Sequence, residues 1–335
     1  MRPRPAALFA MTAQNLPQIF PPDVMARLRD TVEIDPTLTV EDFTDPRART
    51  ALATAEILIT GWGSPRIDEA VLDAAPALRA ILHAAGSVKG LTSPAVWERG
   101  VLVSSAADAN ALPVAEYTLG MILLAGKDLF AHRDRFRTQR AFPQGEIVPG
   151  IGNFGRRVGV VGASRIGRRL IELLKPFDLK VSLADPYVDG AEATALGVRL
   201  LPLDELLRTS DIVTVHAPQT PETLHLIGRR ELALMPTGSV LINTARGALL
   251  DHDALVDELR ADRLGAILDV TDPEPLPVDS PLFDLPNAFI TPHLAGSQGN
   301  EVARLGLAVT QEAERLLAGR ELAHAIDHAA LERTA

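Results

Sequence analysis

Three polar residues of complementary chemistry, Arg246, Glu274 and His293, each follow a short apolar run that reads as a β-strand. Because open parallel sheets bind ligands beyond the carboxyl ends of their strands, we expect these side chains to share one cleft. An imidazole can donate a proton near neutral pH, and a carboxylate can orient it and favour its protonated form. A guanidinium can hold a carboxylate by two parallel bonds. The set therefore suits interconversion of a small 2-keto acid and its 2-hydroxy acid, in which hydride reaches the carbonyl carbon and a proton its oxygen.

A glycine-rich segment, 158–167, joins an apolar strand to a helix and predicts a dinucleotide site. Gly162 allows the tight turn, and Gly167 lets the helix pack closely on the strand, so that the helix N-terminus can meet a pyrophosphate. Ser164 replaces the middle glycine of the GxGxxG pattern, and its side chain narrows that approach. Asp185 ends the second strand, where a carboxylate binds the ribose hydroxyls of NAD and repels the 2′-phosphate of NADP. We therefore expect NAD rather than NADP, with a doubly wound domain lacking a ligand as the alternative.

Short apolar runs alternate with helical segments along most of the chain, which predicts parallel sheets with crossover connections. The six strands expected after residue 157 make a doubly wound sheet. Pro113 is placed in the first turn of a long apolar helix, and 131–154 reads as a polar connector. The expected strands are 7–11, 55–60, 78–83, 158–161, 180–184, 211–216, 239–243, 266–270 and 288–291, and the expected helices are 22–31, 67–75, 113–130, 166–176, 203–208, 253–262 and 299–319.

The bulk properties exclude several classes of protein. A length of 335 residues fits two domains, and a net charge of −10 argues against binding to nucleic acid or to an anionic membrane. The chain has no cysteine, which excludes disulfides, thiolate catalysis and zinc–thiolate sites. The apolar runs at 6–11 and 117–126 are too short for a signal peptide and a membrane span, so we expect a cytoplasmic protein. His324 and His328 have a metal-binding spacing but lack an evident third ligand, and no metal is expected.

The chain resembles the D-isomer-specific 2-hydroxyacid dehydrogenase family over nearly its whole length. The resemblance implies that Arg246, Glu274 and His293 are the catalytic set, and Glu274 argues against a formate dehydrogenase, which lacks an acid at that place. The segment 110–116 is similar to the one that opens the interdomain helix of the family. The other motifs that carry the resemblance are 158–167, 211–218, 243–247, 269–276 and 291–296.

The resemblance also implies the residues that contact the ligands. Asp269 would bind the nicotinamide carboxamide, and the backbone N–H groups of the loop 85–88 would hold the substrate carboxylate. The family is usually rich in Asp and Asn after this loop, whereas this chain continues with Lys89, so the substrate stays open. The implied cofactor residues are Gly162, Ser164, Arg165, Ile166, Gly167, Asp185, His216, Ala217, Pro218, Thr223, Thr244, Ala245 and Asp269, and the implied substrate residues are Ala85, Gly86, Ser87 and Arg246.

The implied architecture has two α/β domains. A flavodoxin-like substrate domain would comprise 1–112 and 299–335, and a Rossmann NAD-binding domain 113–298. The resemblance also implies a homodimer packed through the NAD domains. Two further functions stay open: an NAD(H)-sensing, corepressor-like binding protein on the same fold, and the phosphoglycerate dehydrogenase of serine synthesis.

Overall fold

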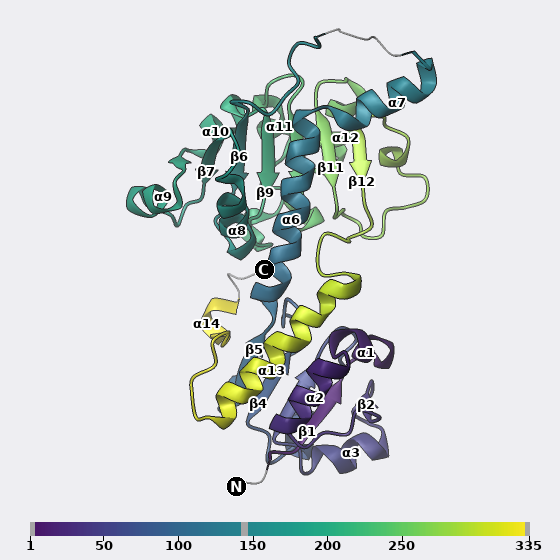
Figure 1. The fold of residues 1–335 in the computed structure, drawn as a ribbon, viewed down its shortest axis with the longest axis vertical. Helices are drawn as coiled ribbons and strands as arrows, with labels where there is room; N and C mark the ends of the chain where they lie inside the picture. The colour runs from purple at the N-terminus through teal and green to yellow at the C-terminus, as the bar shows by residue number, and fades with distance from the viewer. Residues whose placement is uncertain (1–3, 142–146, 332–335) are drawn as a thin grey trace. The chain divides into compact units, whose positions relative to one another are not determined.

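The computed structural model describes residues 4–141 and 147–331, which divide into two compact units. The split unit contains the residues up to 111 together with those from 297 onward, and the central unit contains 112–296. Helix α6 (Ala107–Gly126) begins in the split unit and continues into the central unit. Figure 1 shows the strands and helices of each unit.

The split unit is built on a five-stranded parallel sheet with the order β2-β1-β3-β4-β5. The strands are β1 (Ala7–Ala10), β2 (Thr39–Val40), β3 (Ile57–Thr60), β4 (Ala80–His83) and β5 (Leu102–Ser105). The helices are α1 (Leu16–Ile19), α2 (Pro22–Thr31), α3 (Pro46–Leu52), α4 (Glu69–Ala74), α5 (Ala95–Glu98), α13 (Ala303–Leu317) and α14 (His328–Leu331).

Alternation along its strands gives this sheet two apolar faces, as the period of two in a β-strand requires. Phe9 and Ile57 pack in a core that includes α2 and the C-terminal helix α13. Leu8 and Leu58 point the other way, into a core with α3, α4 and α5. The segment after residue 297 is thereby part of the split unit, although it is far away in sequence.

The central unit holds a seven-stranded parallel sheet with the order β12-β11-β10-β9-β6-β7-β8. The strands are β6 (Arg157–Val161), β7 (Lys180–Ala184), β8 (Arg199–Leu200), β9 (Ile212–Val215), β10 (Val240–Asn243), β11 (Gly265–Leu268) and β12 (Ala288–Ile290). Besides α6, the helices are α7 (Leu129–Gln139), α8 (Arg165–Leu174), α9 (Gly190–Leu196), α10 (Leu203–Thr209), α11 (Arg229–Leu234) and α12 (His252–Arg260). The order reverses between β6 and β9, which is the switch point of a doubly wound sheet.

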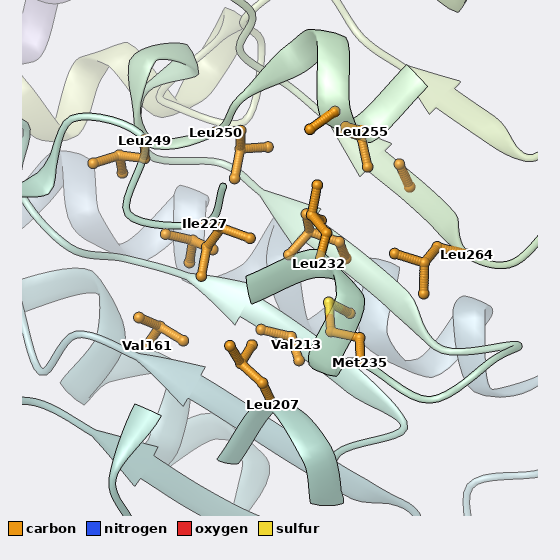
Figure 2. Packing of buried hydrophobic residues seen from close by; sticks show 14 of the residues in the cluster. Val161, Leu207, Val213, Ile227, Leu232, Met235, Leu249, Leu250, Leu255 and Leu264 are labelled. Atoms are coloured by element: carbon orange, nitrogen blue, oxygen red, sulfur yellow. The ribbon is translucent and has the colours of Figure 1, made fainter. Parts of the chain in front are cut away.

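Helices cover both faces of the central sheet. Val161 and Val213 belong to a core with Leu207 of α10, Leu232 of α11 and Leu255 of α12, part of which Figure 2 shows. The alternate strand residues, such as Val160 and Ile242, pack with α6, α8 and α9. A strand buried on both faces is apolar at nearly every position, which is why these strands were evident in the sequence.

The long apolar helix differs from its expected form. It was expected to begin at Pro113, but α6 begins at Ala107 and contains Pro113 in its interior. A proline there removes one intrahelical N–H, a loss that packing of the helix against the sheet offsets. By length and composition alone α6 could cross a membrane, a test that core helices also pass. Ala115 and Ile122 of this helix are fully buried in the central core.

Two other expectations are corrected by the structure. The segment 131–154 was expected to be a connector, but α7 occupies its first part, through Gln139. The central sheet has seven strands rather than six, because the two-residue strand β8 extends its edge beside β7. Residues 142–146 of the expected connector lie outside the described residues.

Candidate active site

The three predicted catalytic residues follow three adjacent strands of the central sheet. Arg246 follows β10, Glu274 follows β11 and His293 follows β12, and these strands pair in parallel in that order. Asn243 is in register with Leu268, so the carboxyl ends of the first two strands lie level with each other. The sheet thus delivers all three residues to a single edge.

His293 and Glu274 form a direct pair. The imidazole Nδ1 lies 2.5 Å from Oε1 of the carboxylate. Half of the His293 side chain and 42% of that of Glu274 are exposed, so both groups remain accessible. The contact engages one ring nitrogen and leaves the other for a different partner, which is the arrangement that a general acid or base requires.

Arg246 is half-buried beside this pair. Its Nη1 donates to the carbonyl oxygen of Ala245 at 2.6 Å. Burial lowers the pKa of Arg246, and the negative charge of Glu274 opposes that shift by raising it. A guanidinium stays charged in proteins in spite of such shifts. The structure therefore places a poorly solvated cation within the field of the Glu274 carboxylate.

A buried asparagine shapes the turn that carries Arg246. Asn243 Nδ2 donates to the carbonyl oxygen of Arg246 at 2.8 Å, and its Oδ1 accepts from the N–H of Ala245 at 3.0 Å. Both side-chain bonds close the turn directly after β10. Asn243 lies in a motif that the sequence identifies, but no role was predicted for it. An Asn directly after a strand often bonds through its side chain to the backbone two residues later, and this tendency is the sequence signal that could have predicted its role in the turn.

Gly247 brings the loops of Arg246 and Glu274 into close contact. An added Cβ at this position would lie 2.0 Å from the carbonyl carbon and oxygen of Thr271 and 2.6 Å from the backbone nitrogen of Asp272. These are backbone atoms, which cannot move away as a flexible side chain can. The glycine is thus needed for the two loops to pack this tightly.

Asp269 lies at the end of β11, under the His293 loop. Its side chain is buried, and it accepts hydrogen bonds from the backbone N–H groups of Leu294 and Ala295, each at 2.9 Å. The predicted nicotinamide neighbours Thr244 and Ala245 are buried just after β10. The Thr244 hydroxyl is 3.0 Å from that of Thr118 on α6. The structure places all three residues at the same edge as the catalytic set.

The predicted dinucleotide turn follows β6. Gly162 has a φ of 98°, in the left-handed region that favours glycine, and a Cβ there would lie 2.6 Å from the backbone nitrogen of Ala217. A Cβ on Gly167 would lie 2.1 Å from the carbonyl oxygen of Gly162. Both glycines are therefore required for the turn to pack beneath α8 and against the loop after β9.

Ser164 is the N-cap of α8. Its hydroxyl accepts from the N–H of Gly167 at 3.3 Å, and the helix begins at the next residue, Arg165. Ile166 packs partly buried in the central core. Arg168 on the same helix donates to the carbonyl oxygen of Ala163 at 2.7 Å and pairs with Glu192 at 2.6 Å. It ties the glycine-rich turn to α9.

Asp185 lies directly after β7 and faces the same turn. One carboxylate oxygen accepts from the N–H of Ala163 at 2.7 Å, and the other accepts from the N–H of Tyr187 at 2.8 Å. A carboxylate has about four acceptor positions, so these two bonds leave capacity for ribose hydroxyls. The two backbone donors also fix the carboxylate in a single orientation.

The loop after β9 completes this edge of the central sheet. His216 is buried, its Nε2 lies 2.9 Å from the Thr214 hydroxyl, and its Nδ1 is a buried atom without a hydrogen-bond partner among the described residues. Burial lowers the pKa of His216 to about 3. The Thr223 hydroxyl donates to the carbonyl oxygen of Pro218 at 2.6 Å and so holds the loop that starts at Ala217.

The predicted substrate loop belongs to the split unit. Ala85, Gly86 and Ser87 follow β4, whose last residue is His83. The ring of His83 is buried, and its Nδ1 lies 2.9 Å from the Thr60 hydroxyl. Burial lowers the pKa of His83 to about 4, and a hydrogen bond to the Ser87 backbone raises it by less. The neutral imidazole therefore links the ends of β3 and β4 at the base of this loop.

The two tail histidines do not share a helix face. His324 precedes α14 and pairs with Asp108, with 2.8 Å between Nδ1 and Oδ2. His328 stacks on Trp97, with 4.5 Å between the ring centroids. Within residues 4–141 and 147–331, the structure shows no cluster of three or more His, Asp or Glu residues that could hold a metal ion.

The topology, the glycine turn and the carboxylate after the second strand define a dinucleotide-binding α/β protein. Residues 119–295 match the family model described as D-isomer specific 2-hydroxyacid dehydrogenase, NAD binding domain. The chain belongs to the D-isomer specific 2-hydroxyacid dehydrogenase family, and the matched region takes NAD. The predicted family, fold class and cofactor are thereby confirmed.

Three relatives illustrate the likeness. D-3-phosphoglycerate dehydrogenase of Mycobacterium bovis is 35% identical over 311 residues, which cover 91% of this chain but 57% of that protein. Glyoxylate reductase of Korarchaeum cryptofilum is 31% identical over 256 residues, 75% of this chain and 76% of that protein. The crystal structure of TT0316 protein from Thermus thermophilus has 32% identity and a TM-score of 0.75, over 96% of this chain and 99% of that one. The chain thus spans little more than half of the mycobacterial relative.

Proposed function

We propose that this protein is an NAD-dependent dehydrogenase that interconverts a small D-2-hydroxy acid and its 2-keto acid. The observation that carries the proposal is the 2.5 Å contact between His293 and Glu274 beside the half-buried Arg246. An acid–base pair and a cation that binds anions are the two requirements of this reaction. They stand at the edge of the sheet where a dinucleotide domain binds its ligand.

The residues around the glycine-rich turn fit NAD. Gly162 lets the turn pack closely against the loop after β9, and the turn leads into the N-terminus of α8, whose backbone N–H groups suit a pyrophosphate. Asp185 presents a carboxylate held by two backbone donors, which favours ribose hydroxyls over a 2′-phosphate. Thr244, Ala245 and Asp269 are the proposed neighbours of the nicotinamide, and the loop from His216 to Thr223 would flank the cofactor.

Bound NADH supplies the hydride that reaches the carbonyl carbon of the keto acid. Arg246 holds the substrate carboxylate through two parallel N–H···O bonds and polarises the carbonyl. His293 donates a proton to the carbonyl oxygen as negative charge develops there, and Glu274 keeps the ring in place. In the oxidative direction the same imidazole accepts the hydroxyl proton.

The substrate belongs to the small 2-keto acids. We propose that backbone N–H groups of Ala85, Gly86 and Ser87 bind the carboxylate of this substrate. Phosphoglycerate is itself a 2-hydroxy acid, and the mycobacterial relative named for it keeps phosphoglycerate oxidation as a second candidate. We further propose a cytoplasmic homodimer; the exposed Leu129 and Phe136 of α7 support an apolar contact of the NAD domains.

The proposal is tested by NADH oxidation with glyoxylate, hydroxypyruvate, pyruvate, phenylpyruvate and phosphohydroxypyruvate. We expect turnover with at least one of them, and His293→Ala should lower kcat by about 10²–10⁴-fold while NADH fluorescence still reports binding. His328→Ala, at an exposed position of α14, is the matched control and should keep the parent rate. Tight NADH binding without turnover of any acid would instead favour an NAD(H)-sensing binding protein. Unchanged kcat in His293→Ala would refute the assigned role of this histidine.

A further inference from the structure

Asp269 joins the end of β11 to the loop that carries His293. Its Oδ1 accepts from the Thr291 hydroxyl at 2.6 Å and from the Leu294 N–H at 2.9 Å, and its Oδ2 accepts from the Ala295 N–H at 2.9 Å. Its own carbonyl oxygen accepts from the N–H of His293 at 2.9 Å. Asp269 thus accepts four hydrogen bonds from the segment 291–295, which hold the backbone on both sides of His293.

The network continues to α6 through Thr291. The hydroxyl oxygens of Tyr117 and Thr291 are 2.8 Å apart. A hydroxyl has a single hydrogen, and Thr291 directs its own to the Asp269 carboxylate, which is an acceptor only. The Tyr117 hydroxyl must therefore donate to Thr291. Burial raises the pKa of Tyr117, so its phenol keeps the proton that this bond needs.

The His293 backbone needs such restraint. Its φ is 51°, a left-handed conformation that is uncommon for residues other than glycine and persists where the surroundings enforce it. The bonds on either side, at Thr291 and Leu294, fix the chain before and after this residue. The imidazole is half exposed, so little direct packing holds the ring itself.

We propose that Tyr117 and Thr291 are positioning residues that act through Asp269 to hold the His293 loop in its reactive conformation. This inference rests on the proposed function, because it takes His293 as the acid–base group. Neither hydroxyl needs to touch a ligand in this role. The network also engages three acceptor positions of Asp269, so most of its bonding capacity serves the loop rather than a nicotinamide.

The experiment compares Thr291→Val, Thr291→Ser and Tyr117→Phe in the full chain. Thr291→Val keeps the shape and removes the hydroxyl, and we expect kcat to fall about tenfold because a displaced imidazole transfers a proton less well. Thr291→Ser keeps the hydroxyl and should recover kcat to within about twofold of the parent, while Tyr117→Phe should lower it about three- to tenfold. The KM for the keto acid and the Kd for NADH should stay within about twofold in all three variants.

Amide hydrogen exchange provides a readout independent of catalysis. The Leu294 and Ala295 amides should exchange about tenfold faster in Thr291→Val, with Thr291→Ser near the parent rate. If the parent protein turns over none of the keto acids, the proposed function fails, and faster exchange in the valine variant still supports the network. Unchanged kcat together with unchanged exchange would overturn the inference. Weaker NADH binding with an unchanged kcat at saturating NADH would also overturn the inference, because the network would then serve cofactor binding and not the position of His293.

Discussion

A methyl group at Gly247 should separate the two loops that carry Arg246 and Glu274. The Cβ of Gly247→Ala would lie 2.0 Å from the Thr271 carbonyl, whereas ordinary van der Waals contact begins at 3.4 Å. Relief therefore needs a backbone shift of about 1.4 Å, because the opposing atoms belong to the main chain. A misplacement of about 1 Å in an active site can lower the rate about 10²-fold, equivalent to about 2.7 kcal/mol of transition-state stabilisation.

The assay is kcat/KM for the best keto acid, measured with NADH affinity and the melting temperature. Gly190→Ala is the matched control, since a Cβ there meets no heavy atom within 4 Å and the residue lies in the first turn of α9. We expect Gly247→Ala to lose about 10²-fold in kcat/KM with NADH binding retained, and Gly190→Ala to keep the parent value. A Gly247→Ala enzyme within about threefold of the parent would show that the spacing of these loops does not govern the chemistry.

Three further predictions address charge and protonation. Arg246→Lys should raise the KM for the keto acid about tenfold or more in steady-state assays, because an ammonium lacks the two-pronged geometry; an unchanged KM contradicts that role. Asp185→Ala should raise the ratio of kcat/KM with NADPH to kcat/KM with NADH about tenfold. An unchanged ratio would show that this carboxylate does not discriminate between the two cofactors at the ribose. Burial lowers the pKa of His83 to about 4, so the unfolded chain binds its proton more readily. The free energy of unfolding should therefore fall by up to about 1.4 kcal/mol per pH unit as the pH drops from about 6.5 towards 4. In urea unfolding measured across this pH range, His83→Gln should show a weaker pH dependence than the parent protein. The same pH dependence in both proteins would contradict the prediction.

Sequence patterns found the strands of three or more residues in which most positions are apolar. The run at 211–216 contains β9, and 180–184 matches β7, since nearly every residue there is buried or half-buried. The two-residue strands β2 and β8 are too short for any periodicity to register. Strand β5 was missed for another reason: Leu102 is exposed and the buried residues include Ser104 and Ser105, which inverts the usual pattern.

The residues of the candidate site also divide into those that the sequence predicts and those that it does not. Arg246, Glu274 and His293 were predictable because parallel strands bring their carboxyl ends to one edge. Tyr117 and Thr291 were not, because their contact joins positions 174 residues apart and depends on where α6 crosses the sheet. The residue types alone do not predict this hydrogen bond, because the partner of a buried hydroxyl depends on which polar groups the tertiary structure places beside it.

Ser164 illustrates how the structure changes the meaning of a departure from a motif. In the sequence its side chain narrows the approach to a pyrophosphate, but in the structure its hydroxyl caps α8 by accepting from the Gly167 N–H. A serine cap stabilises a helix by about 1 kcal/mol and engages the third N–H of the first turn. The proposed pyrophosphate contacts therefore fall on the two preceding backbone groups, those of Arg165 and Ile166, as the family resemblance implies. The serine thus secures the helix end without occupying the donors that the cofactor is proposed to use.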